Sequence, residues 1–201
     1  MGNFSVAYRV LSAFEEVGRV RRGYFVDGLG AAQFAADGVV DRLRSEPSGF
    51  GGKKDMPATV VLAATDPANA YGASVDWPHR QASGGDVSAE SAKLGHRPGR
   101  KAGSLVVLHD GQLAWYVERG GRTVLTFHQD PEILEVSARA LAESVRAGRV
   151  GALTIAAVDG VPVLSAEGSS HGVGGREAVP GPSALVKAGF SLTPQGLRIR
   201  G

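Results

Sequence analysis

Residues 104–127, SLVVLHDGQLAWYVERGGRTVLTF, contain three apolar runs separated by two short turns. The runs are residues 104–108, 112–118 and 122–127. The turns hold Asp110-Gly111 and Gly120-Gly121, dipeptides that favour tight β-hairpins because Asp and Gly tolerate positive φ. The segment therefore predicts a three-stranded antiparallel meander, with Trp115 in the core.

Both sides of the meander carry further structural signals. Pro131 to Ala147 has apolar residues at helical spacing and is followed by Gly148, so it predicts a helix. The other expected elements are strands at 59–64, 153–158, 161–165 and 197–199 and a short helix at 182–188. Residues 58–201 are thus expected to form a mainly antiparallel β-barrel or sheet domain with a packed helix, and with flexible loops at about 79–101 and 168–182.

Residues 1–46 predict part of a winged helix. Ser5 is expected to cap a helix that ends at Gly18, and strands at 19–26 and 31–35 then form a wing hairpin, followed by a short helix after Asp37. Residues 47–57 have the composition of a linker. The predicted fold class is α+β, a partial winged helix followed by the barrel-like domain.

Composition excludes several classes of protein. The 201 residues are 43% hydrophobic, include no Cys and carry a net charge of +2. Disulfide frameworks and thiolate metal sites are therefore excluded. No run of about 18 apolar residues predicts a membrane span, and the N-terminus lacks the pattern of a signal peptide, so a cytoplasmic protein is expected.

Local positive charge marks the candidate nucleic-acid contacts. A near-neutral net charge is unusual for a protein that neutralises many phosphates, so clusters of cations matter more than the total. The candidates on or beside the wing are Arg19, Arg21, Arg22 and Tyr24, and those in the following basic loop are Arg97, Arg100 and Lys101. Solvated surface arginines and a solvated linker are the alternative interpretations.

Motifs for phosphate-loop, metal and hydrolase chemistry are incomplete. Three glycine clusters fail as phosphate loops, because Gln33, Lys54 and Glu177 occupy positions that need Gly, Ser/Thr and Gly, respectively. The five histidines show no metal-ligand spacing, and no Gly-x-Ser-x-Gly occurs. We therefore expect no cofactor or metal in this chain. Asp66-Pro67-Ala68-Asn69 follows an apolar strand and is interpreted either as an Asx turn or as a polar site.

Four segments, in order, resemble the C-terminal part of the large helicase-related (Lhr) family of superfamily 2 helicases. They are RRGYFVDGLGAAQFA (21–35), ATDPANAYG (64–72), LAWYVERGGR (113–122) and PQGLR (194–198). The resemblance implies the last winged helix and the terminal β-barrel-like domain of a long protein. Its ATPase motifs, with ATP and Mg²⁺, would lie in upstream helicase domains. That C-terminal region is similar in architecture to helix-turn-helix DNA glycosylases, and family members are associated with uracil excision.

Three functional hypotheses follow. The first is a nucleic-acid-binding accessory module of an Lhr-type ATP-dependent DNA helicase involved in DNA repair, with DNA and the upstream helicase domains as partners and no membrane. The second is a DNA glycosylase module in which Asp66, the acid inside a family-like segment, is the candidate catalytic residue. The paired glutamines of the similar glycosylases have no counterpart in this sequence. The third is a non-catalytic oligomerisation or partner-docking domain.

Overall fold

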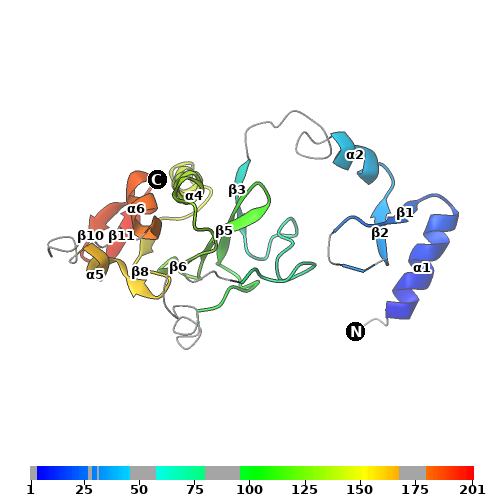
Figure 1. Cartoon of the computed structure of the whole chain (residues 1–201), viewed down its shortest axis with the longest axis horizontal. Helices are drawn as coiled ribbons and strands as arrows, with labels where there is room; N and C mark the ends of the chain where they lie inside the picture. The colour runs from blue at the N-terminus through cyan, green and yellow to red at the C-terminus, as the bar shows by residue number, and fades with distance from the viewer. Residues whose placement is uncertain (1–3, 27–28, 31, 46–57, 80–95, 168–179) are drawn as a thin grey trace. The chain divides into compact units, whose positions relative to one another are not determined.

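A computed structural model describes residues 4–26, 29–30, 32–45, 58–79, 96–167 and 180–201. The chain divides into two compact units, Met1–Pro57 and Ala58–Gly201 (Figure 1). The predicted linker at 47–57 lies outside the described residues, as do most of the predicted loops at 79–101 and 168–182. The predicted end of the second loop, residue 182, was wrong, because a helix already begins at Pro180.

The first unit contains α1 (Phe4–Glu16), β1 (Val20–Gly23), β2 (Gln33–Ala36) and α2 (Val39–Ser45). Gly18 adopts a φ of 73° just after α1, as expected for a residue that ends a helix. Ser5, however, lies inside α1 and does not cap it. This order of helix, hairpin and short helix agrees with the partial winged helix predicted from sequence.

The hairpin strands are shorter than expected because the Gln33 side chain replaces backbone pairing. Its Oε1 accepts hydrogen bonds from the amides of Phe25 (3.0 Å) and Val26 (2.9 Å), and its Nε2 donates to the Val26 carbonyl (3.0 Å). These groups would otherwise pair with a second strand, so β1 ends at Gly23.

The second unit is built on a six-stranded sheet in the order β3-β4-β5-β6-β8-β9. Its strands are β3 (Thr59–Ala63), β4 (Leu105–His109), β5 (Gln112–Val117), β6 (Thr123–Thr126), β8 (Ala157–Val158) and β9 (Val161–Pro162). The β4-β5-β6 meander is confirmed, whereas the pairing of β6 with β8 is parallel. In the described part of the chain β3 and β9 form the two edges, so the sheet is open and the expected barrel is not confirmed.

A second, three-stranded sheet has the order β10-β11-β7 and contains β10 (Ser191–Thr193), β11 (Gly196–Ile199) and β7 (Leu153–Ile155). Two short helices, α5 (Val163–Glu167) and α6 (Pro180–Lys187), also belong to this unit. The predicted strand at 161–165 was wrong beyond its first two residues. Pro162 has no amide to donate to a ladder, and the chain turns into α5 directly after it.

The core of the second unit lies between the sheets and α4 (Pro131–Arg146), which Figure 1 shows beside β5 and α6. The Asp130 carboxylate caps α4 by accepting from the Glu132 amide at 2.8 Å. Trp115 is fully buried, as predicted, and its Nε1 donates to the Leu134 carbonyl at 3.1 Å. None of the helices in the described ranges is long and apolar enough to cross a bilayer.

Candidate nucleic-acid interface

Arg22 is part of the internal structure of the winged-helix hairpin. Its Nη2 lies 2.6 Å from the Glu15 carboxylate, and its Nη1 donates to the Tyr8 hydroxyl at 3.0 Å. The guanidinium carbon also lies 5.5 Å from the Tyr8 ring centre and 5.4 Å from that of Phe34. The hydrogen bond to Glu15 raises the pKa of Arg22 above its ordinary value. The guanidinium therefore joins β1 to α1.

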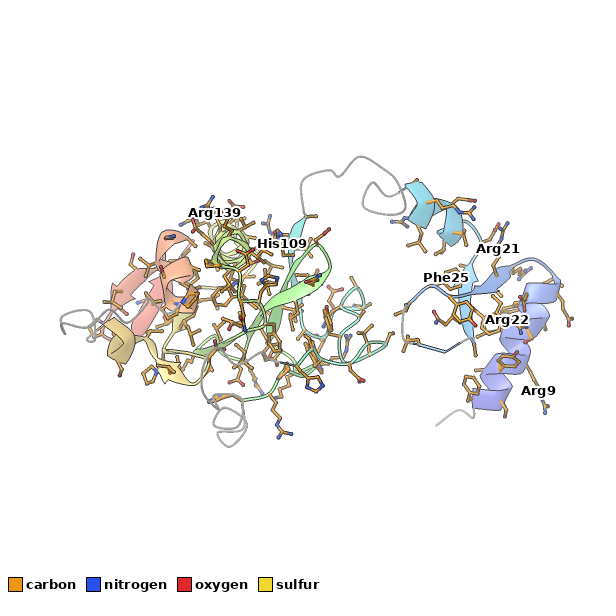
Figure 2. The ribbon with its side chains drawn as sticks, in the orientation of Figure 1. Arg9, Arg21, Arg22, Phe25, His109 and Arg139 are labelled. Atoms are coloured by element: carbon orange, nitrogen blue, oxygen red, sulfur yellow. The ribbon has the colours of Figure 1, made fainter. Side chains whose placement is uncertain are left out.

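Arg21 lies on the other face of the hairpin, because successive side chains of a strand alternate. It is paired with Ala35, whereas Arg22 is paired with Phe34, beside α1 (Figure 2). Arg19 and Arg21 are exposed, and within the described residues neither guanidinium has a hydrogen-bond or ion-pair partner. Arg22 is also exposed, but it lies on the opposite face of the hairpin from Arg21 and is held by Glu15 and Tyr8.

Tyr24 follows β1 and is 80% exposed, so its ring is open to a ligand. Within six consecutive residues the described chain thus carries two unpaired cations, Arg19 and Arg21, and one exposed aromatic ring, Tyr24. Guanidinium groups bind phosphate, and an aromatic ring can stack on a base.

The three cations of the basic loop differ in how they are held. Arg100 donates to the carbonyls of Asn69 (2.6 Å), Thr65 (3.0 Å) and Asp66 (3.1 Å). Lys101 is exposed and donates to the Arg97 carbonyl at 3.3 Å. Arg97 is exposed, and its guanidinium has no partner among the described residues. The structure therefore places Arg100 inside a loop and leaves the other two on the surface.

The polar segment 65–69 is a closed turn that Arg100 and Asn69 hold together. The Asp66 Oδ1 accepts from the Ala68 amide at 2.8 Å, which is the Asx turn that the sequence suggested as one of two interpretations. Asn69 is fully buried; its Nδ2 donates to the Ala64 carbonyl at 2.9 Å, and its Oδ1 accepts from the Tyr71 amide at 3.2 Å. The hydrogen bond that the Asp66 carboxylate accepts thus stays within its own turn.

Trp77 and His109 both make contacts with other side chains of the second unit. Trp77 stacks on Tyr71, with ring centres 6.0 Å apart, and meets Tyr116 edge to face. The His109 Nδ1 lies 2.8 Å from the Thr59 hydroxyl, across the β3-β4 pair. Among the described residues, no three His, Asp or Glu side chains are grouped so that they could hold a metal ion.

Sequence reasoning missed a second group of arginines near the C-terminus. Arg146, Arg198 and Arg200 line one cavity, together with residues of the β10-β11 hairpin. Arg198-Ile199-Arg200 alternates cation and apolar residue, which is the pattern of a half-buried strand with a basic outer face. That alternation could have predicted the basic face of the strand. No local pattern indicated that Arg146 of α4 lies at the same cavity.

Comparison with known proteins agrees with this architecture. Residues 1–53 match the family described as large helicase-related protein, winged-helix domain. The chain is 46% identical over 199 residues to the "Lhr helicase/ probable uracil glycosylase" of Mycolicibacterium smegmatis, covering 99% of this chain and 12% of that protein. It is 33% identical over 197 residues to the "Lhr helicase/uracil glycosylase" of Escherichia coli K12, covering 98% of this chain and 11% of that protein.

The chain therefore spans only a small fraction of the length of these relatives. The matched winged-helix domain coincides with the helix and hairpin that present Arg19 and Arg21. Both the fold of the first unit and the near full-length match of this chain lead to the same conclusion. The chain belongs to the large helicase-related (Lhr) family and corresponds to a small C-terminal part of its members.

Proposed function

We propose that this chain is a nucleic-acid-binding accessory module of an Lhr-type ATP-dependent DNA helicase that acts in DNA repair. DNA, duplex or single-stranded, is its ligand, and the helicase domains of a longer protein are its partners. ATP and Mg²⁺ are used by those domains and not by this module. The observation that supports the proposal most directly is the winged-helix hairpin, on which Arg19 and Arg21 are exposed and unpaired within the described residues.

The division of roles among the wing arginines follows from their contacts. A guanidinium that binds a DNA phosphate displaces counterions condensed on the DNA. A guanidinium that is already paired with a carboxylate of the protein would have to give up that contact first. Arg19 and Arg21 have no such contact among the described residues, while Arg22 is held by Glu15 and Tyr8. In the proposed complex Arg19 and Arg21 contact phosphates, Tyr24 stacks on an adjacent base or sugar, and Arg22 maintains the hairpin.

Replacing Arg19 and Arg21 together by Gln is expected to weaken DNA binding and to reduce the slope of log K against log salt by about two. The reason is that each lost phosphate contact removes about 0.9 from that slope on duplex DNA. Fluorescence anisotropy of a labelled duplex over a range of salt concentrations measures it. Arg22→Gln is instead expected to lower the melting temperature of the first unit.

A charge-matched control is Arg139→Gln with Lys187→Gln. Both side chains form ion pairs of 3.0 Å with Glu135 in the second unit, so their loss changes net charge equally but removes no free cation. This control should retain the wild-type slope. An Arg19/Arg21 double variant with an unchanged slope would refute the proposed wing contact, and a wild-type chain that does not bind DNA would favour the docking alternative.

Base excision is the second candidate function, because the names of both relatives include uracil glycosylase. In this chain Asp66 is the candidate acid, since it lies in a family-like segment at the end of β3. A catalytic carboxylate would have to activate water or stabilise a developing cation on the sugar. The geometry favours the structural role, as the Asp66 carboxylate bonds the Ala68 amide of its own turn.

Asp66→Asn is therefore expected to retain the turn, with a loss of stability of about 1 kcal/mol or less, because an amide oxygen also accepts the Ala68 hydrogen bond. DNA binding should be unchanged. If Asp66 is catalytic, uracil excision should fall about a hundredfold at equal stability, because charge and basicity are lost. Excision assays and thermal melts on the same samples distinguish these outcomes, and equal excision by both proteins would eliminate the catalytic role.

A further inference from the structure

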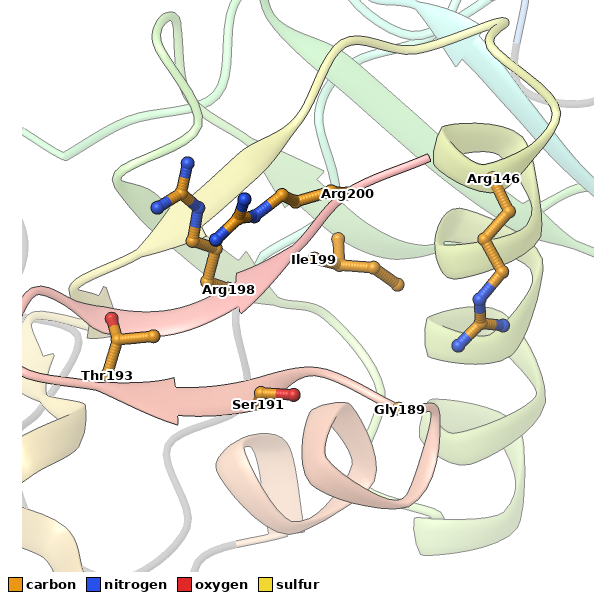
Figure 3. A pocket seen from close by; sticks show the side chains of 7 residues that line it. All are labelled: Arg146, Gly189, Ser191, Thr193, Arg198, Ile199 and Arg200. Carbon is orange, nitrogen blue, oxygen red and sulfur yellow. The ribbon is translucent and has the colours of Figure 1, made fainter.

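A cavity of about 250 Å³ lies at the C-terminal hairpin of the second unit (Figure 3). Its lining includes three arginines from two elements that are distant in sequence, Arg146 from the end of α4 and Arg198 and Arg200 from β11 and the residue after it. Ser191 and Thr193 of β10 add two hydroxyl groups. None of the described residues that line it is Asp or Glu.

The register of the sheet explains why Arg198 and Arg200 share one face with Ser191, while Arg146 lies on the side of Ile199 (Figure 3). Arg198 is paired with Ser191 on one side and with Thr154 on the other, so the three side chains project to the same side. Arg200 is two residues after Arg198 and projects with it, as Figure 3 shows. Leu197 and Ile199 alternate with them and are buried in the core. The hydrophobic anchoring of β11 thus orients both guanidinium groups outward.

The three cations have donor capacity that the protein does not use. The Nε of Arg198 is buried and has no hydrogen-bond partner, and Arg200 has none among the described residues. Arg146 uses one Nη2 hydrogen bond, to the Ala188 carbonyl at 3.1 Å. The missing side chain of Gly189 makes room for that guanidinium, because an added Cβ would collide with its Nη2. Buried donors without partners are costly, so this site is suited to an anion.

We propose that this cavity binds a phosphodiester group of DNA, as a second contact site distinct from the wing hairpin. Arg198 and Arg200 would bind the phosphate oxygens, since the planar guanidinium matches their geometry, and Ser191 or Thr193 would donate a further hydrogen bond. The cavity is smaller than the 300–1,000 Å³ or so of typical small-molecule pockets, which suits a phosphate group of a passing strand better than a whole nucleotide. The inference rests on the proposed DNA-binding function.

The test is Arg198→Gln with Arg200→Gln in the 201-residue chain, with DNA binding measured over a range of salt concentrations. The expected result is a slope reduced by about two, one unit for each lost phosphate contact, at an unchanged melting temperature. The Arg139→Gln/Lys187→Gln protein again serves as the charge-matched control. Arg200→Gln alone, at an exposed position, should reduce the slope by about one and guards against a folding defect at Arg198.

Inorganic phosphate distinguishes the two sources of the anion. If free phosphate is the ligand, millimolar phosphate should raise the melting temperature of the wild type but not of the double variant, while the DNA salt slope of the variant stays at the wild-type value. That result would overturn the inference. A reduced slope, with or without a phosphate effect on melting, supports it.

The wing variant separates this inference from the proposed function. If Arg19→Gln/Arg21→Gln reduces the slope but Arg198→Gln/Arg200→Gln does not, the second contact site is wrong and the wing proposal stands. If only the C-terminal variant has an effect, the wing proposal is wrong and the second site stands. Additive reductions in the combined variant are expected if both sites contact one DNA molecule.

Discussion

Replacing Arg100 by Ala is expected to lower the free energy of unfolding of the second unit by about 3 kcal/mol. Its guanidinium donates to three loop carbonyls at 2.6–3.1 Å, those of Asn69, Thr65 and Asp66. Hydrogen bonds from a charged donor each contribute about 1.5–3 kcal/mol, but water can replace those at the exposed edge of the loop. The segment that carries Asp66 should therefore lose its order before the sheet does.

Chemical denaturation of the wild type and the variant measures this loss, and Arg97→Ala is the matched control. Arg97 lies in the same loop, is exposed and has no side-chain partner among the described residues, so its removal should cost less than about 0.5 kcal/mol. The opposite pattern, a stable Arg100→Ala protein with a flattened DNA salt slope, would identify Arg100 as a phosphate contact, which was the expectation from sequence.

Gly196→Ala is expected to destabilise the second unit by about 3 kcal/mol or more and to disrupt the three-stranded sheet. Gly196 has a φ of 123°, and an added Cβ would collide with the backbone carbonyl of Ile155 on β7. Both the unfavourable φ and the overpacking contribute, at about 1–2 and 1–3 kcal/mol, respectively. Since β11 presents Arg198 and Arg200, the proposed second DNA contact should be lost with the sheet.

Gly111→Ala separates the two causes. Gly111 has a φ of 78° in the β4-β5 turn, but an added Cβ would meet nothing within 4 Å. Its replacement should therefore cost only about 1 kcal/mol, from backbone strain. Equal melting temperatures for the two alanine variants would show that the close approach of β7 to Gly196 has no energetic consequence.

Local sequence signals were sufficient where the structure depends on neighbouring residues. The Asp-Gly and Gly-Gly turns predicted the meander, apolar spacing predicted α4, and Asp66-Pro67-Ala68 suggested its Asx turn. Local signals failed where a contact with a residue distant in sequence replaces the expected local pairing. The wing strands stop early because the Gln33 side chain bonds Phe25 and Val26. In the described residues β6 is followed in the sheet by β8, although α4 and β7 separate the two strands in sequence, and β3 and β9 remain as open edges.

The α+β class, the helix-hairpin order of the first unit and the family of the chain could all be predicted from sequence, since they depend on local periodicity, turn residues and long ordered motifs. Which arginines are free to bind a ligand required the three-dimensional structure. Arg21 and Arg22 are adjacent in sequence, yet only Arg22 forms an ion pair with Glu15, which lies seven residues before it. Arg100 finds its carbonyl partners 31 to 35 residues away, whereas Arg198 and Arg200 find none among the described residues. Every arginine carries the same charge, so its charge does not show whether its guanidinium is bonded within the protein or is free to bind a phosphate. That depends on partners that are distant in sequence.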